Sequence, residues 1–395
     1  MADDSGAALY EFFAGGGFAR LGLEPLFACT FANDFDAGKA AAYRAAFGPD
    51  HLVERDVWAI EPADLPGRAA LAWASSPCQD VSLAGARQGL SAARSGAFWG
   101  FWRLIEALDA EGRGPAVVAL ENVSGLLTSH GGADFGALCG AMAASGRTVG
   151  ALEIDASLFT PQSRPRVFVI AARAAPAGLQ APAPTGVFHT KAVRAAHARL
   201  PEAAKAAWAW WRLPAPPLRN HALADILEPE DRVRWRADAA TQRLLEQMSP
   251  RQRAQIDALL KRGEARVGAA FRRVRVEDGI KVQRVEARFD GLAGCLRTPA
   301  GGSSKQILLA VGAGRVRSRL MTAREAARLM GAPDSYPLPA GETAGLHLVG
   351  DAVAPPVVRW LAERLLKPLA EAARTQRAAP SRAATKKNPG AGAPG

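Results

Sequence analysis

Short apolar runs separated by polar turns divide the first 173 residues into alternating strands and helices. Helical patterns at 18–24 and 97–112 stand between runs that have the length of buried strands. These strand-like runs lie at 8–14, 26–34, 71–76, 116–123 and 164–172. Strand, turn and helix in succession predict an α/β fold with a mostly parallel sheet. Ligands of such sheets bind beyond the carboxyl ends of the strands, so we expect the polar tips to surround one crevice.

The alternation stops after residue 173, where a Pro- and Ala-rich stretch (AAPAGLQAPAPTG) is typical of a linker. Helical sequence at 238–263 and short strand-like runs then predict a smaller domain of mixed structure. Helical patterns return at 321–331, where Thr322 and Glu325 hold the positions of a capping box, and at 355–373. We predict four parts: an α/β domain at 1–173, a second domain at 174–318, helices that return to the first domain at 319–373, and a disordered basic tail at 374–395.

Composition indicates a globular protein of a reducing compartment. Hydrophobic residues make up 49% of the chain, and the mean hydropathy is −0.03. No apolar run reaches the roughly 18 to 20 residues of a membrane helix, and no signal peptide is recognisable at the N-terminus. The cysteines are scattered without zinc-binding or disulfide spacing, so we expect no metal and treat Cys29, Cys139 and Cys295 as small core residues. We expect a cytoplasmic protein.

The charge is unevenly distributed along the chain. Residues 1–173 contain 13 Lys and Arg against 19 Asp and Glu, whereas residues 174–320 contain 26 against 13. A basic segment beside an acidic one is typical of a protein that binds a polyanion such as nucleic acid. A GC-rich genome, which encodes arginine at many surface positions, would produce the same excess. The charge alone therefore does not choose between the two explanations.

A turn of three glycines, Gly15, Gly16 and Gly17, stands between the first strand and the first helix. Glycine lets the backbone approach a ligand closely, and a helix N-terminus favours a carboxylate or phosphate. Asp34 and Asp56 end the next two strands, where an acid can accept hydrogen bonds from ribose hydroxyls. The pattern predicts a site for an adenosine-containing cofactor and leaves a nicotinamide and S-adenosylmethionine both open.

A free cysteine, a carboxyl group and two arginines stand at the ends of further strands. Cys78 lies in the run ASSPCQDVSLAG, Glu121 lies near the end of the strand at 116–123, and Arg164 and Arg166 lie in QSRPR. Carbon 5 of cytosine becomes nucleophilic when a thiolate adds to carbon 6, an acid protonates ring nitrogen 3 and a cation holds the carbonyl. These residues in one crevice would supply that chemistry. A small buried thiol, a solvated strand end and a solvated turn are the simpler structural explanations.

Eight motifs in order make the chain resemble the bacterial cytosine-5 DNA methyltransferases from Glu11 to about Leu369. They are FAGGG, NDFD, SSPCQDVSLAG, RSGAF, LENV, PQSRPRVFVIA, RLMTAREAARLMG and GDAVAPPVV. The resemblance implies a Rossmann-like methyltransferase sheet beside a smaller mixed target-recognition domain. It assigns 1–173 to catalysis with S-adenosyl-L-methionine as cofactor, and 174–318 to DNA recognition.

The resemblance also assigns roles to individual residues. It implies that Cys78 is the nucleophile, that Glu121 binds and helps to protonate a flipped-out cytosine, and that Arg166, supported by Arg164, grips the base. The implied cofactor residues are Phe13, Ala14, Gly15, Gly16, Gly17, Asn33, Asp34, Phe35, Asp56, Val57, Pro77, Asp351, Ala352 and Val353. The expected DNA contacts are Gln79, Ser82, Arg297, Thr298 and Lys305, with Arg297 and Lys305 on the phosphate backbone.

Three positions depart from the family pattern. Glu11 stands where the family often has Asp, Phe18 stands where a further Gly is common, and Asp351 in GDAV stands where Asn is usual. These departures concern the cofactor contacts rather than the reaction.

The predicted function is transfer of a methyl group to carbon 5 of cytosine in a specific duplex DNA sequence, through a covalent adduct with Cys78. A tRNA-acting branch shares these motifs, but the long basic domain favours duplex DNA. A non-enzymatic nucleic-acid binder would have no use for a converging Cys, Glu and Arg. We expect a bacterial monomer that associates with the nucleoid through DNA, with a restriction endonuclease of the same specificity as a candidate partner.

Overall fold

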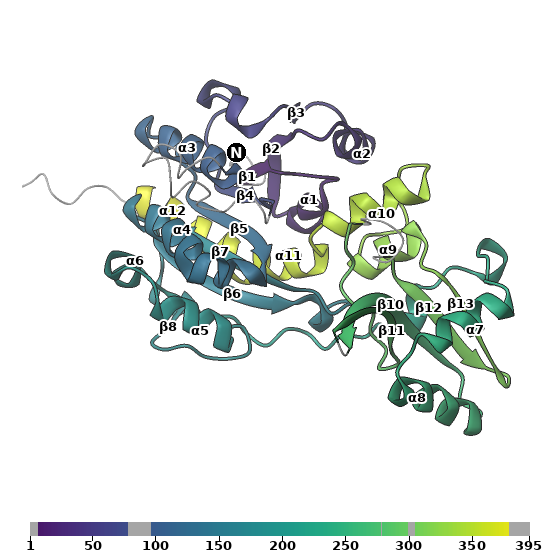
Figure 1. Cartoon of the computed structure of the whole chain (residues 1–395). Helices are drawn as coiled ribbons and strands as arrows, with labels where there is room; N and C mark the ends of the chain where they lie inside the picture. The colour runs from purple at the N-terminus through teal and green to yellow at the C-terminus, as the bar shows by residue number, and fades with distance from the viewer. Residues whose placement is uncertain (1–6, 78–95, 278, 299–304, 379–395) are drawn as a thin grey trace, which may run out of the picture.

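The computed structural model describes residues 7–77, 96–277, 279–298 and 305–378, and its strands form three sheets (Figure 1). The large sheet contains β1 (Ala7–Phe12), β2 (Phe27–Asp34), β3 (Leu52–Glu54), β4 (Leu71–Ala74), β5 (Val117–Val123), β6 (Thr148–Asp155) and β7 (Pro165–Ala172). A four-stranded sheet contains β10 (Arg266–Glu277), β11 (Ile280–Arg288), β12 (Ile307–Gly312) and β13 (Arg315–Leu320). A small third sheet pairs β8 (Gln180–Ala181) with β9 (Trp210–Trp211).

The large sheet has the strand order β3-β2-β1-β4-β5-β7-β6. The pairs among β1 to β5 are parallel, whereas β7 is antiparallel to both β5 and β6. The predicted α/β class with a mostly parallel sheet is confirmed. Because β7 runs in the opposite direction, its first residues lie at the edge where β1, β2, β4 and β5 end.

Helices cover both faces of the large sheet because its side chains alternate between the faces. Leu71 and Trp73 of β4 pack into the core of one face, and Ala72 and Ala74 into the other. The first face carries α1 (Phe18–Leu23), α2 (Ala37–Phe47), α11 (Pro355–Leu361) and α12 (Lys367–Ala378). The second face carries α3 (Ala97–Ala110), α4 (Ala133–Ala144), α5 (Lys191–Ala198) and α6 (Glu202–Ala206). In the described part of the chain, no helix has the length and apolar character needed to cross a membrane.

Residues 177–211 pack with the large sheet rather than with the smaller domain. Trp208 forms a bridge with Val149 of β6, and Val193 and Ala196 of α5 enter the core of the second face. Trp211 of β9 is buried in the core of the first face. By packing, residues 177–211 therefore lie with the large sheet, whereas the boundary at residue 174 stays a prediction. The Pro- and Ala-rich composition indicated a linker, but the apolar side chains that follow it, such as Val193 and Trp211, are buried in the cores on the two faces of the large sheet.

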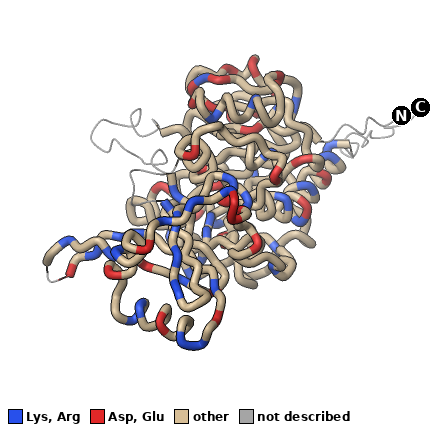
Figure 2. The backbone as a smooth tube through the Cα atoms, turned by 90° about the vertical axis from the view of Figure 1, so that its right-hand side faces the viewer, with Lys and Arg blue, Asp and Glu red and all other residues tan. Residues whose placement is uncertain are grey.

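The smaller domain consists of the β10–β13 sheet in the order β11-β10-β12-β13, with α7 (Asp238–Glu246) and α8 (Pro250–Lys261) packed on it. The helical sequence at 238–263 forms two helices. Pro250 has no N–H to continue α7 and begins α8 instead, where the Ser249 hydroxyl accepts a hydrogen bond from the Gln252 amide. Figure 2 shows Lys and Arg along the strands and helices of this domain.

Two further helices, α9 (Ala323–Met330) and α10 (Glu342–Asp351), return the chain to the first domain. The predicted capping box of Thr322 and Glu325 is confirmed at the start of α9. The Glu325 carboxylate is fully buried and also accepts hydrogen bonds from the Arg319 guanidinium, 2.7 and 2.5 Å away, and from the Glu228 amide at 2.9 Å. One carboxylate therefore joins β13, α9 and the segment that precedes α7.

We expect Glu325→Gln to lower the free energy of unfolding by about 3 to 5 kcal/mol, because it leaves the Arg319 guanidinium buried without a counter-charge. Urea denaturation followed by tryptophan fluorescence measures this loss. Glu363→Gln changes an exposed glutamate in the same part of the chain and should shift stability by less than about 0.5 kcal/mol. Similar values for the two variants would contradict the role given to Glu325.

Candidate active site

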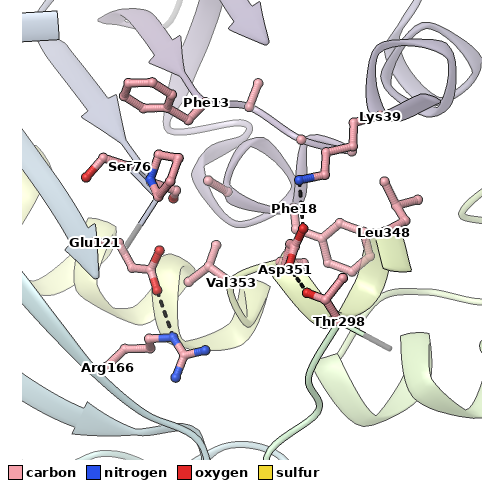
Figure 3. Close-up of a pocket in the computed structure, with 18 of the residues that line it drawn as sticks. Phe13, Phe18, Lys39, Ser76, Glu121, Arg166, Thr298, Leu348, Asp351 and Val353 are labelled. Atoms are coloured by element: carbon pink, nitrogen blue, oxygen red, sulfur yellow. Dashed lines mark hydrogen bonds and ion pairs between the residues drawn. The ribbon is translucent and has the colours of Figure 1, made fainter. Parts of the chain in front are cut away.

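A cavity of about 570 Å³ opens where the large sheet ends against the smaller domain (Figure 3). Its wall comes from the ends of β1, β2, β4 and β5, the start of β7, the segment after β11 and the turn after α10. The volume lies within the range of about 300 to 1,000 Å³ that small-molecule sites occupy. The predicted site residues in this wall are Phe13, Ala14, Gly15, Gly16, Asp34, Phe35, Pro77, Glu121, Arg164, Arg166, Arg297, Thr298, Asp351, Ala352 and Val353.

The glycine turn after β1 packs against Tyr336 at Gly16 and is open towards the cavity at Gly15. Gly15 has φ +55°, and a Cβ added to it would meet no atom within 4 Å. A Cβ on Gly16 would lie 2.5 Å from the hydroxyl oxygen of Tyr336, which donates a hydrogen bond to the Gly16 carbonyl at 2.7 Å. The Asp34 carboxylate accepts a hydrogen bond from the Gly15 amide at 2.7 Å, and burial raises the pKa of Asp34. The turn can therefore receive a ligand against its backbone.

Glu121 and Arg166 form an ion pair in the wall of the cavity (Figure 3). The Arg166 Nε lies 3.1 Å from the Glu121 Oε1, and both side chains are largely buried. The antiparallel pairing of β5 with β7 places Val123 opposite Arg166, so Glu121, two residues earlier, lies diagonally across from the arginine on the same face. The pair combines an acid and a cation within reach of one ligand.

Arg164 lies beside this pair, but its guanidinium makes other contacts. It is 2% exposed and donates hydrogen bonds to the carbonyl oxygens of Leu296 at 2.8 Å, Gly350 at 3.0 Å and Ala352 at 2.6 Å. Burial lowers its pKa to about 10, so it stays charged at neutral pH. These hydrogen bonds join the smaller domain to the end of α10, and the role predicted for Arg164, support of Arg166 at the base, stays a prediction.

Sequence reasoning missed several residues of the cavity wall, among them Cys295 and Lys39. Cys295, expected in the core, is partly exposed there, with its sulfur 3.4 Å from a nitrogen of Arg164, whereas Cys29 and Cys139 are buried as expected. Lys39, in the first turn of α2, reaches across to Asp351 at 2.7 Å. No motif contains Lys39, so only the unusual acid at 351 could have suggested a partner for it.

Other predicted site residues lie outside this wall. Asn33 donates hydrogen bonds from its side chain to the carbonyls of Val53 and Arg55, which ties β2 to β3. Asp56 accepts a hydrogen bond from the Trp58 amide in a short 3₁₀ helix. Gly17, which precedes α1, and Val57 also lie outside the wall. So does Lys305, whose amino group lies 3.5 Å from the Thr343 hydroxyl.

Cys78, Gln79 and Ser82 lie outside the described residues. Within the described ranges, no group of three or more His, Cys, Asp and Glu side chains is arranged to hold a metal ion.

A family model for C-5 cytosine-specific DNA methylases matches residues 7–367. The chain belongs to this family. It is 31% identical over 162 residues to the Type II methyltransferase M.BsuFI of Bacillus subtilis, a match that covers 40% of this chain and 38% of that protein. It is 25% identical over 361 residues to the Type II methyltransferase M.NlaX of Neisseria lactamica, covering 90% of this chain and 95% of that protein. The first of these matches thus spans less than half of its relative's length.

Solved structures show a similar fold. The S. pombe Dnmt2 methyltransferase matches with a TM-score of 0.54 and 16% identity, covering 92% of this chain and 99% of that chain. A Spodoptera frugiperda DNMT2 matches with a TM-score of 0.58 and 16% identity, with the same coverage. The predicted fold, a methyltransferase-type α/β sheet beside a smaller mixed domain, is confirmed.

Members of this family use S-adenosylmethionine as the methyl donor, and the cavity fits that molecule. The open side of Gly15 leaves room for a ligand against the backbone. Asp34 presents a carboxylate at the end of β2, and the neighbouring Phe35, 67% exposed, offers an aromatic face in the same wall on which an adenine ring can stack. Gly15, Asp34 and Phe35 are thus the residues that would hold the adenosine part.

We expect Arg164→Lys to lower the free energy of unfolding by at least about 2 kcal/mol, because an ammonium group lacks the planar fork that reaches three carbonyls and leaves buried acceptors unpaired. Arg173→Lys is the matched control, since that guanidinium is a third exposed and paired with Asp109. Chemical denaturation of both variants measures the difference. Equal losses would show that Arg164 does not join the two domains.

Proposed function

We propose that this chain transfers a methyl group from S-adenosylmethionine to carbon 5 of a flipped-out cytosine in duplex DNA. The observation that carries the proposal is the shared cavity. One side holds the Glu121–Arg166 pair, suited to a polar base, and the other holds Gly15, Asp34 and Phe35, suited to an adenosine. Membership of the C-5 cytosine-specific DNA methylase family supports this assignment.

Arg166, Glu121 and Cys78 each have a separate role in the proposed reaction. Arg166 donates hydrogen bonds to the carbonyl of the base, and Glu121 delivers a proton to ring nitrogen 3 while the Cys78 thiolate adds to carbon 6. The electron pair of the carbon 5–carbon 6 double bond then becomes available at carbon 5. The cofactor, when bound, supplies the methyl group. Loss of the proton on carbon 5, departure of the thiolate and return of the proton from ring nitrogen 3 to Glu121 restore the neutral aromatic ring. Cys78 follows Pro77, which lines the cavity.

Duplex DNA is the substrate that the smaller domain favours. Residues 213–320, which follow β9, contain 21 Lys and Arg against 12 Asp and Glu. Such an excess attracts phosphates, and backbone contacts offset the few kcal/mol that unstacking a cytosine costs. Arg297 and Thr298 connect this domain to the cavity wall. Because relatives of this chain are Type II methyltransferases, we also propose that it acts in restriction-modification, beside an endonuclease of the same specificity. We further propose that the protein is a monomer.

With S-adenosylmethionine and duplex DNA, the protein should produce 5-methylcytosine within one short sequence, as read by bisulfite sequencing. Cys78→Ser should abolish this transfer and retain DNA binding, because a hydroxyl is far less ionised than a thiol at neutral pH. A tRNA transcript assayed in parallel should remain unmethylated. Methylation of the transcript alone, or more than a few per cent of turnover in Cys78→Ser, would refute the proposed reaction.

Glu121→Gln should reduce turnover by about a hundred- to ten-thousand-fold, because the amide cannot deliver the proton that activates the ring. The affinity for S-adenosylhomocysteine, measured by calorimetry, should stay within about twofold, since the carboxylate lies on the base side of the cavity. Glu371→Gln, on the exposed surface of α12, serves as control. Weakened ligand binding with unchanged turnover would place Glu121 in the wrong half of the cavity.

A further inference from the structure

The β10–β11 hairpin extends from the smaller domain and carries apolar side chains in solvent (Figure 2). Val274 is 57% exposed, and Val276 and Ile280, nearer the turn, are each 67% exposed. β11 is also an edge strand of the four-stranded sheet. Because grouped apolar side chains in water mark surfaces that bind a partner, the hairpin is a candidate interaction surface.

Ion pairs engage the charges on one face of this hairpin. Side chains alternate between the faces of a strand, so the pairing of β10 with β11 places Arg273, Arg275 and Glu277 on the same face as Arg284 and Glu286. The Glu286 carboxylate pairs with both Arg273 and Arg275. Arg284 pairs with Glu277. The charges of this face are therefore mostly satisfied within the protein.

The opposite face of the hairpin combines basic and apolar side chains. The same register places Arg272, Val274 and Val276 of β10 beside Lys281 and Gln283 of β11. In the described residues of β10 and β11, every Asp or Glu side chain lies on the other face. We call these five residues the basic face. With no acid of its own strands beside it, the basic face is suited to a polyanion.

A second arginine lies close to the basic face. Arg236 lies just before α7, which packs on the same side of the sheet, and its amide donates a hydrogen bond to the Ser318 carbonyl at 2.9 Å. Burial, and next the charge of Arg272, lower the pKa of Arg236. The Arg272 Nε is buried and has no acceptor among the described residues. Two guanidiniums that repel each other, one with an unused donor, can share an anion such as a phosphate.

The shape of the hairpin favours duplex DNA as the source of that phosphate. The major groove admits a two-stranded β-ribbon, and apolar side chains there contact the methyl group of thymine. Phosphates flank the groove, so one ribbon can present arginines to the backbone and valines to the bases. After β11 ends at Arg288, the chain soon reaches the cavity wall at Cys295. The basic face is thus connected to the cavity by a short segment.

We propose that the basic face docks in the major groove of duplex DNA, with Arg236 and Arg272 on one phosphate and Val274 and Val276 against base edges. The inference rests on the proposed function, because it takes duplex DNA as the substrate. The phosphate contact contributes affinity for any sequence, whereas the valines contribute to the choice of sequence.

Two labelled duplexes of equal length test this division by fluorescence anisotropy with the full chain. One contains the sequence that bisulfite sequencing identifies, and the other lacks it. Arg272→Gln should weaken the binding of both duplexes alike, by about tenfold. It should also make the fall of log affinity with log salt concentration shallower by about 0.9, the value for one phosphate. The double variant Val274→Ser/Val276→Ser should weaken only the first duplex, by about tenfold, and keep the salt dependence.

Two matched controls lie outside the basic face. Arg262→Gln changes an exposed arginine of the same domain that pairs with Glu264 at 2.6 Å, and Val187→Ser changes a valine that is 65% exposed in the part packed with the large sheet. Both should leave DNA affinity within about twofold. Wild-type affinity for both duplexes in Arg272→Gln and in the valine variant would overturn the inference, while the proposed function stands as long as the wild-type chain methylates DNA. Failure of the wild-type chain to bind or methylate any duplex would instead overturn the proposed function, and the inference with it.

Discussion

The buried guanidinium of Arg164 holds the cavity in its shape. Arg164 directly precedes β7. Its N–H groups donate hydrogen bonds to the carbonyl oxygens of Leu296, between β11 and β12, and of Gly350 and Ala352, at the end of α10. A guanidinium is suited to this position because its donors lie in one plane and it keeps its charge when buried. The Glu121–Arg166 pair and the turn at Gly15 line the same cavity as the segments that Arg164 joins.

The direction of β7 is the second constraint. A parallel strand at this place would begin at the opposite edge of the sheet, and Arg166 would lie far from Glu121. Because β7 is antiparallel to β5, its first residues meet the last residues of β5, and an acid and a cation that are 45 positions apart in the sequence form an ion pair at 3.1 Å. The same edge receives the turn after β1 and the end of β2, so two ligand-binding regions share one cavity.

Charge is balanced differently in the two halves of the cavity. At one end, the Glu121 carboxylate lies 3.1 Å from the Arg166 guanidinium. At the other, the carboxylates of Asp351, Asp34 and Asp36 interact electrostatically with the amino group of Lys39. An ion pair in a half-buried wall depends on both of its members, because removing either leaves a charge that water does not fully solvate. The acid at 351 and the lysine at 39 are therefore best understood together, as one feature of this chain.

The sequence by itself determined the alternation of strands and helices, the capping box at Thr322 and Glu325, and most residues of the cavity wall, because these depend on local periodicity and on motifs contiguous in the chain. Only the tertiary structure decided the rest. It packs residues 177–211 against the large sheet, where Trp211 is buried and Trp208 pairs with Val149, and it places the Arg164 guanidinium against backbone carbonyls. It also brought Lys39 to Asp351, 312 positions away, and no local pattern encodes a contact between segments so far apart in the sequence.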